Sequence, residues 1–353
     1  MAQPIKGKGR SGSVASFIGK LHGSASEAKS RAAADAAQRK SAGVAPRSII
    51  LRPDEVHGEY DAARVLTTTL GGVHRPITTD DLASFRQNIR TVQRSLKGGI
   101  RVRQVLDLSL PSDRERARSQ IHMAVPAIAN NGKVRFVTSA GPDSDVSRHH
   151  VTVEFLGFGA AASAGRSSAK QMAAFIRKEP IKFDCDCGRH RYFLRYISTI
   201  GGFNAGRAET GFPKITNPRL VGVACKHVLR VMAEIESSAG VLNFLTKLIE
   251  RSRASDDSNA RLRNTQKDAE ALAEKQGKRV RDIKTSDDRQ KDRDAARARK
   301  ALSDALKKAP PPKKKAASTR KASATDKAAA LLAKQFNMTP EQLMGLLASQ
   351  SKG

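Results

Sequence analysis

The three cysteines of this 353-residue chain stand in two short clusters, and a histidine lies close to each cluster. Cys185 and Cys187 belong to the stretch FDCDCGRHRY, whereas Cys225 is followed by His227 in GVACKHVLRV. An odd number of cysteines argues against a disulfide scaffold and favours a reducing compartment. Residues as close as Cys185 and Cys187 also meet the geometry of a disulfide poorly. The clusters therefore indicate either a metal site or ordinary buried thiols.

The spacing inside each cluster favours the metal site. Residues i and i+2 of a strand point to the same face, so Cys185 and Cys187 can chelate one ion if the strand ends in a turn at Gly188. Apolar residues at helical spacing follow Cys225 and His227, which predicts that these two residues open a helix. The unpaired N–H groups and the dipole at the start of a helix favour a thiolate over a thiol.

Three thiolates and one imidazole form a closed tetrahedral set, and Zn²⁺ is the ion that best suits it. A closed set leaves no coordination position open, so one zinc ion would be structural rather than catalytic. Because the clusters are separated by the 37 residues 188–224, this ion would close a long loop. His190, in the first cluster, is an alternative to His227 as the fourth ligand.

This pattern of C-x-C followed at a distance by C-x-H resembles the SWIM-type zinc finger, including the aliphatic residues of CKHVLRV. In that family the C-x-C lies on a strand or hairpin and the C-x-H opens a helix. The match covers roughly 50 of the 353 residues. The separation of its halves is longer than usual because of the Gly/Pro-rich insertion 198–222. The resemblance implies either nucleic-acid binding or protein–protein contacts.

The charge of the chain indicates its partners rather than its fold. Its 64 Lys and Arg residues against 34 Asp and Glu give a formal net charge of +30 at pH 7. A surplus of this size attracts polyanions, nucleic acid first and an anionic membrane surface second. No apolar run is long enough to predict a transmembrane segment. The first residues lack the apolar core of a signal peptide.

Basic residues interleaved with aromatics crowd the loop between the cysteine clusters. This composition suits contacts with a phosphate backbone and exposed bases, although the aromatics could equally form the core of the finger. A further basic cluster stands in the stretch PPPKKKAASTRK. The candidate nucleic-acid contacts are Arg189, Arg191, Arg195, Arg207, Lys214, Arg219, Lys313, Lys314 and Lys315.

Shifts in composition divide the chain into six segments. We predict a disordered basic arm at 1–47, an α+β domain at 48–180, a SWIM-like zinc finger with its helix at 181–250, a charged helix at 251–308, a basic Pro/Ala/Ser linker at 309–327 and a short helical hairpin at 328–353. The charged segment 251–308 has no sustained heptad, so it is either a long solvated helix or a chain that orders on a partner. In the last segment, Thr339 followed by Pro340 predicts a helix start.

Patterning within 48–180 predicts individual elements. Alternating apolar residues predict strands at 49–56, 100–110, 133–140 and 149–158. Helical spacing predicts helices at 79–97 and 167–179, the first capped by Thr79 and ended by Gly98 and Gly99. Strands and helices mix without a regular βαβ rhythm. We therefore expect an α+β fold with a central mixed or antiparallel sheet, helices on one face, and a zinc-clipped finger.

No set of residues predicts catalysis. The stretch RHHVTVEF offers His149, His150 and Glu154, but strand alternation places the two histidines on opposite faces. The acidic stretches SDRERARS and GPDSD lack the partners that a hydrolase needs. We therefore expect a non-enzymatic protein.

The plan of the chain, and the stretch YISTIGGFNAGRAETGFPKITNPRLVGVACKHVLRV in particular, resembles small basic virion proteins of tailed bacteriophages. Some proteins of that kind are packaged with the genome and ejected with it. The resemblance implies that the protein is located in the virion, and in the host cytoplasm while the virion is assembled. It also implies other virion proteins as partners and leaves open whether the protein is an oligomer.

The leading hypothesis is a non-enzymatic, zinc-binding virion structural protein that associates with the phage genome through sequence-independent DNA binding. The alternative is a cellular SWIM-type regulator that binds DNA or recruits partners. A nuclease ranks last because the sequence shows no acidic metal site.

Overall fold

The computed structural model describes residues 50–58, 66–96, 99–142, 144–255, 260–279, 281–308, 327, 330–331, 333–334 and 338–343. The predicted arm 1–47 and nearly all of the predicted linker 309–327, with Lys313, Lys314 and Lys315, lie outside these residues. The chain divides into two compact units between Asp292 and Arg293.

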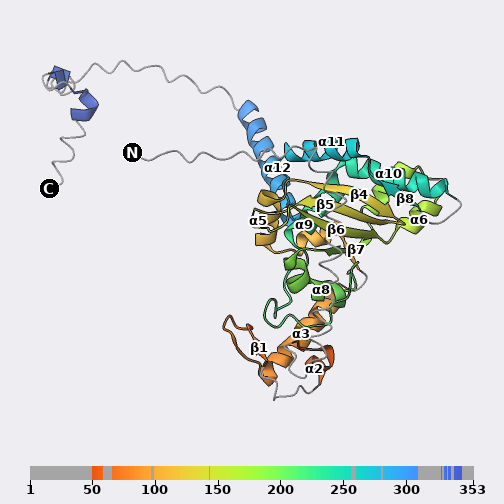
Figure 1. Ribbon diagram of the computed structural model, residues 1–353. Helices are drawn as coiled ribbons and strands as arrows, with labels where there is room; N and C mark the ends of the chain where they lie inside the picture. Colours follow the sequence, from red (N-terminus) through yellow and green to blue (C-terminus); the bar gives the residue numbers. More distant parts are fainter. Residues whose placement is uncertain are drawn as a thin grey trace. The chain divides into compact units, whose positions relative to one another are not determined.

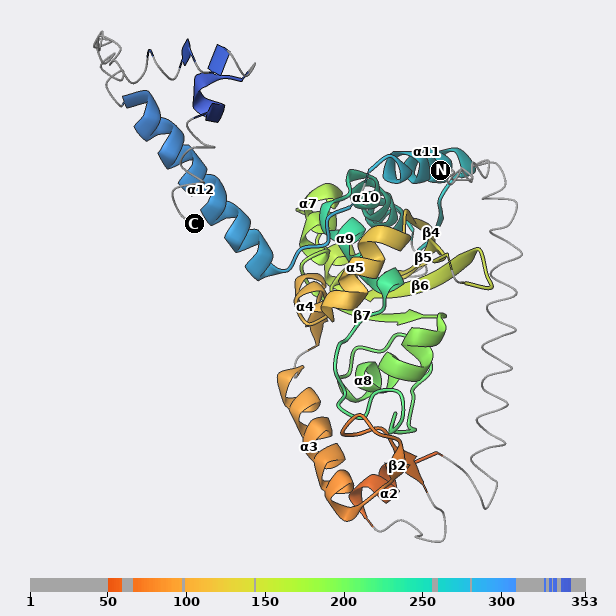
Figure 2. The same ribbon diagram turned by 90° about the vertical axis from the view of Figure 1, so that its left-hand side faces the viewer.

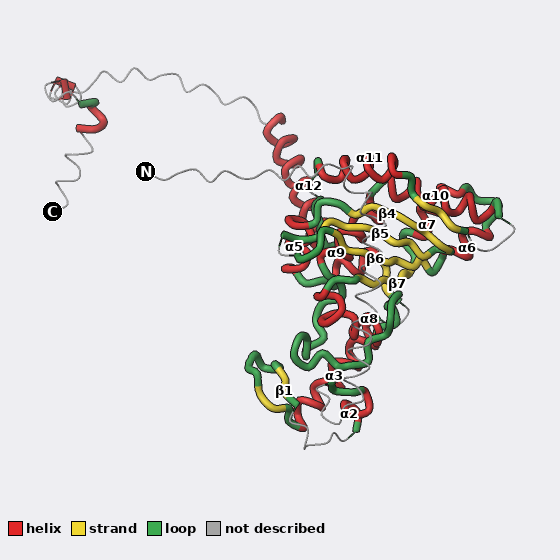
Figure 3. Tube along the Cα trace, in the orientation of Figure 1, coloured by secondary structure: helices red, strands yellow, loops and turns green. Residues whose placement is uncertain are grey.

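A six-stranded sheet lies at the centre of the first unit, with the strand order β3-β7-β6-β5-β4-β8 (Figures 1 and 3). Every neighbouring pair of strands is antiparallel. The strands are β3 Ile100–Arg101, β4 Ala124–Asn130, β5 Lys133–Ser139, β6 Arg148–Phe155, β7 Pro180–Cys185 and β8 Arg261–Arg263. With its helices, this sheet confirms the predicted α+β class and the predicted strands at 133–140 and 149–158.

Helices cover one face of this sheet (Figure 2). They are α6 Phe158–Ser163, α7 Ala169–Ile176, α9 Lys226–Ser237 and α10 Ala239–Arg253. Helix α9 crosses β4 to β7, α10 contacts β4 and β8, and α7 packs on α10. The strand side chains facing these helices are apolar and buried, among them Val134, Phe136, Val151, Val153 and Phe183. Their burial on this face is the main source of the stability of the sheet.

The opposite face of the sheet is covered at one end by α11 Gln266–Gly277. Ala269 and Ala273 of α11 form a small apolar cluster with Met123, Val125 and Val137. The helix begins after Thr265, whose side chain accepts a hydrogen bond from the backbone N–H of Asp268. The strand residues beyond this cluster on the same face are polar or exposed.

The hairpin between β4 and β5 turns through Asn131 and Gly132, both with positive φ (45° and 76°). Two such residues form the tight turn whose twist matches that of antiparallel strands, and Asn-Gly is the favoured pair. Gly132 also lies against Phe158 at the start of α6, where an added Cβ would meet the Phe158 Cβ at 2.5 Å. The glycine is therefore required both by the turn and by this contact.

The substitution Gly132→Ala should lower the free energy of unfolding by about 1–3 kcal/mol, because it combines a strained φ with overpacking against Phe158. Urea unfolding measures the change. Gly159→Ala is the matched control: Gly159 lies in α6, has no positive φ, and an added Cβ there meets nothing within 4 Å. The control should keep or slightly raise stability. Equal loss in both variants would contradict the argument.

A separate group of elements packs below the sheet (Figures 1 and 2). It combines α2 Pro53–His57, β1 Thr67–Thr68, β2 Arg75–Pro76 and α3 Thr79–Ser95 with the insertion 198–222 and α8 Arg195–Ile200. The rings of Phe85 in α3 and Phe212 in the insertion lie 4.3 Å apart. The Thr68 hydroxyl donates to the Lys214 carbonyl at 2.7 Å. The Gly/Pro-rich insertion thus forms a core with the segment that precedes the sheet.

Two predicted strands are wrong. In 49–56, Leu51 forms a single bridge to Phe212, and the chain then enters α2 at Pro53, a residue suited to the first helical turn. In 100–110, β3 has only two residues and α4 Val102–Asp107 follows. The Gln104 side chain accepts the backbone N–H of Arg101 and so caps α4. Buried positions 102, 105 and 106 fit helical spacing as well as they fit alternation.

The predicted helix at 79–97 is α3, and the one at 167–179 is α7. The cap of α3 is Thr78 rather than Thr79. Its hydroxyl accepts the backbone N–H of Asp81, and the Asp81 carboxylate accepts the N–H of Thr78. Arg75 binds the same carboxylate and holds the pKa of Asp81 down, to about 2.

The segment 251–308 forms several elements rather than the single helix predicted. After the end of α10, the described residues of this segment form β8, α11 and α12 Ser286–Lys308 in turn. Residues 282–284, between α11 and α12, line a pocket together with residues of α5 Pro111–Gln120. In the second unit, Thr339 caps a helix that begins at Pro340, as predicted, by accepting the backbone N–H of Gln342 at 3.3 Å. Among the helices that the structure describes, none has the length and apolar character needed to cross a bilayer.

Candidate metal centre

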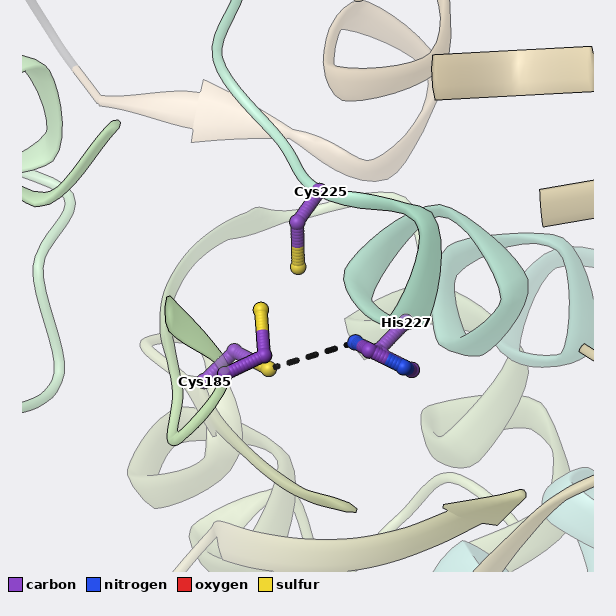
Figure 4. A group of neighbouring side chains, drawn as sticks. Cys185, Cys225 and His227 are labelled. Atoms are coloured by element: carbon purple, nitrogen blue, oxygen red, sulfur yellow. Dashed lines mark hydrogen bonds between the residues drawn. The ribbon is translucent and has the colours of Figure 1, made fainter. Parts of the chain in front are cut away.

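The two cysteine clusters meet where β7 ends and α9 begins (Figure 4). Cys185 is the last residue of β7, opposite Val151 of β6, and points toward the helices. Cys187 lies in a bend after β7, and Gly188 begins a helical segment that continues into the π-helix His190–Leu194. Cys225 is the residue that precedes α9, and His227 lies in its first turn. The strand end at Cys185 and the helix start at Cys225 agree with the prediction from the spacing, whereas the turn predicted at Gly188 is the start of a helix.

The four side chains form one compact group. Their candidate ligand atoms, three Sγ and one imidazole nitrogen, all lie within 4.8 Å of one another. His227 presents Nδ1 to the thiols, 3.9 Å from the Cys185 Sγ. A tetrahedral ion with bonds of about 2.0–2.3 Å holds its ligand atoms roughly 3.5 Å apart. Small side-chain adjustments would therefore bring all four atoms to one ion.

The group is closed to solvent. The exposed fraction is 0% for Cys185 and Cys225, 5% for Cys187 and 2% for His227. The His227 Nε2 is buried, with no hydrogen-bond partner among the described residues. A group of this composition, shielded from solvent, can hold a metal ion.

Without a metal, the three thiols share their charge unequally. Hydrogen bonds from Cys185 and Cys225 hold the pKa of the Cys187 thiol well below its usual value. Burial raises the pKa of the Cys185 and Cys225 thiols well above theirs. The backbone N–H of His190 donates to the Cys187 Sγ at 3.4 Å and favours its thiolate. Burial lowers the pKa of His227, which favours the neutral imidazole that binds metals.

Asp186, which lies between the two cysteines of the first cluster, contacts two further histidines. Its carboxylate lies 2.8 Å from the Nδ1 of His149 and 3.1 Å from the Nδ1 of His150. These two contacts hold the pKa of Asp186 well below its usual range despite its burial. The ring of His149 packs on the ring of His227, with centroids 4.2 Å apart. His149 therefore connects Asp186 to the ring of His227.

His149 and His150 alternate along β6, as expected, yet both contact the same carboxylate, that of Asp186. Asp186 lies past the last ladder pair of β7, where its backbone N–H donates to the His150 carbonyl at 3.2 Å. From this strand end, one carboxylate reaches both rings. Asp184 and Asp186 alternate with the two cysteines in FDCDC. That alternation was the signal that could have identified both acids as neighbours of the site.

His190 is not a member of the group. Its ring is fully buried, with Nε2 3.1 Å from an oxygen of Asp184. The structure therefore places His227, and not the alternative His190, beside the three thiols.

Several of the arginines predicted to contact nucleic acid make contacts inside the fold. Arg189 binds both carboxylate oxygens of the buried Asp113 at 2.7 Å and lies over the ring of Phe193. Arg195 binds Asp184 and the Cys185 carbonyl. These two arginines therefore stabilise the segment that carries the cysteines, Arg189 through Asp113 and Arg195 through Asp184 and Cys185. The sequence predicted neither this role nor the part that Asp113 plays in it.

The other candidates differ in exposure. Arg191 and Lys214 are buried, with 9% and 8% of their surface exposed, whereas Arg207 and Arg219 are exposed. Lys313, Lys314 and Lys315 lie outside the described residues. Among the six candidates that the structure describes, only Arg207 and Arg219 are therefore exposed.

Comparison of the chain with protein-family models, with curated proteins and with solved structures finds no match to any of them. What identifies the site is its own geometry: four buried Cys and His side chains that can hold a metal ion.

Proposed function

We propose that Cys185, Cys187, Cys225 and His227 bind one structural zinc ion. The observation that carries this proposal is the closed, buried group of three thiols and one imidazole within 4.8 Å. Thiolate and imidazole ligands in a tetrahedral set suit Zn²⁺ better than the oxygen-binding Mg²⁺ or Ca²⁺. The zinc would supply folding free energy by joining the start of α9 to the end of β7. Because no coordination position is open, we propose a non-enzymatic role.

We further propose that this zinc-stabilised protein associates with nucleic acid as a structural component of a phage virion. The net charge of +30 supports association with a polyanion. The resemblance of the chain's organisation to basic virion proteins supports the proposal that it is a component of the phage particle. Charge spread over several segments favours contacts with phosphates, which supply affinity and little sequence information.

Purified protein should contain about one zinc per chain and should retard random-sequence duplex DNA in a salt-dependent manner. About six phosphate contacts would weaken binding roughly a thousandfold between 50 and 200 mM salt. Metal analysis and gel retardation measure the two quantities, and purified virions show whether the chain is a component of the particle. A metal-free folded protein would contradict the zinc site. Strong preference for one short duplex at all salt concentrations would favour the regulator instead.

A further inference from the structure

The face of the sheet opposite α7, α9 and α10 carries two rows of side chains that the strand register places side by side. One row runs through Arg263, Ile128, Arg135 and Thr152, and the other through Arg261, Asn130, Lys133, Glu154 and Lys182. Residues paired directly across antiparallel strands point to the same face. We call these nine residues the open face. Helix α11 covers only the neighbouring end, over Val125 and Val137.

Five of the nine residues are basic, and they stand on alternate strands. Arg261 and Arg263 belong to β8, Lys133 and Arg135 to β5, and Lys182 to β7. Four of them are exposed, and Lys182 is half-buried. Strands lie about 4.8 Å apart, so basic side chains recur about every 9.6 Å across the sheet and about 6.7 Å along a strand.

Two acidic groups among the described residues belong to these rows, Glu154 and Asp184. Glu154 lies 3.6 Å from Lys133, and both side chains are partly exposed, so their mutual attraction is weak. Asp184, which follows Thr152 in the first row, is bound by Arg195 and His190. Among the described residues, the open face therefore carries five basic side chains, of which Arg263 already has a partner, and the carboxylate of Glu154.

We propose that the open face binds the phosphate backbone of duplex DNA. The proposal rests on the proposed association with nucleic acid and gives it a location, distinct from the finger arginines whose contacts lie inside the fold. A grid of long, cationic side chains on a rigid sheet fits a repeating array of phosphates.

The composition of the open face favours a duplex over a single strand. None of its nine residues is aromatic, and single strands are held largely by stacking of bases on aromatic rings. Backbone contacts alone fix position without reading sequence, as expected for a protein that binds any duplex. The open face also lies on the side of the sheet away from the Cys185 side chain, which belongs to the core facing α9. Substitutions on it should therefore leave the metal group intact.

The test replaces three of these cations in the full-length protein: Arg135→Gln, Lys182→Gln and Arg261→Gln together. The matched control removes three exposed cations from the helical side, Arg166→Gln, Lys170→Gln and Lys178→Gln, which lie on or beside α7. Both triple variants lose the same charge. Binding to a random-sequence 20-base-pair duplex is measured from 50 to 200 mM salt, together with zinc content and thermal unfolding.

The open-face variant should reduce the slope of log affinity against log salt by about 2.7, because each lost phosphate contact removes about 0.9. Between 50 and 200 mM salt, the affinity of the open-face variant should therefore fall by a factor about fortyfold smaller than that of the wild type. The α7 variant should keep the wild-type slope, and both variants should keep zinc and their unfolding temperature.

Equal slopes in the two variants, or a wild-type slope in the open-face variant, would contradict the assignment of DNA binding to the open face. Such a result would not contradict DNA association itself. A wild-type protein that fails to bind the duplex at any salt concentration would overturn the proposed association as well. Binding to phosphatidylserine vesicles but not to the duplex would have the same meaning, with a membrane surface as the partner. Tighter binding to the single strand, lost in the open-face variant, would overturn the choice of a duplex.

Discussion

The substitution Cys225→Ser should abolish stoichiometric zinc binding and remove most of the stability of the region around α9. A structural zinc site contributes on the order of 10 kcal/mol to folding in small zinc-binding domains. The whole free energy of unfolding of a domain is only about 5–15 kcal/mol. Serine keeps the size of the side chain but is a poor zinc ligand, and the remaining thiols would stay buried without a metal. Metal analysis and thermal unfolding measure the loss.

Two histidine variants and a chelator separate metal loss from general damage. His227→Gln should lose zinc, whereas His190→Gln should keep it, although both rings are buried. A chelator should lower the unfolding temperature of the wild type to that of Cys225→Ser and should have no further effect on the variant. Full zinc retention in Cys225→Ser or His227→Gln would contradict the assignment of the ligands.

The substitution Glu234→Gln should lower the free energy of unfolding by about 3–5 kcal/mol, because it leaves a buried arginine without its counter-charge. Glu234 and Arg230 lie one turn apart on α9, with 0% and 1% of their side chains exposed. Arg281 binds both oxygens of the same carboxylate at 3.0 and 2.8 Å. Burial already lowers the pKa of Arg230, and its Nε is buried without a hydrogen-bond partner among the described residues.

The control for this prediction is Glu274→Gln, the same change in a pair with the same i,i+4 spacing. Glu274 lies on α11 and Lys278 directly follows this helix, and 58% and 73% of their side chains are accessible. Solvent screens such pairs, so the control should hardly change stability. Chemical denaturation of both variants gives the comparison. Similar small changes in the two would show that Arg230 does not depend on Glu234.

The sequence predicted the metal group well because its information is local. A two-residue spacing on a strand and at a helix start defines the direction of each side chain, and three thiols left few alternatives. The choice between His227 and His190 was not local. It depends on the packing of His190 beside Asp184, which no spacing reveals.

The contacts that sequence reasoning missed join residues far apart in the chain. Arg189 meets Asp113 across 76 residues, and a basic residue near a zinc finger is equally typical of a phosphate contact. The strand predicted at 100–110 failed for a different reason. Val102, Val105 and Leu106 are buried in a helix, and a short apolar segment fits both periods until its neighbours decide between them.

The three-residue strand β8 has a consequence for how copies of this protein meet. It occupies the outer edge of β4, pairing Arg263 with Ile128 and Arg261 with Asn130. Unpaired strand edges attract other edges, and short, charged edge strands discourage such pairing. A fragment ending at Arg253 would retain all four cysteine and histidine ligands but would leave the backbone of β4 uncovered. Such a fragment would bind zinc and still tend to aggregate through that edge, so solubility rather than metal content decides where the protein can be shortened.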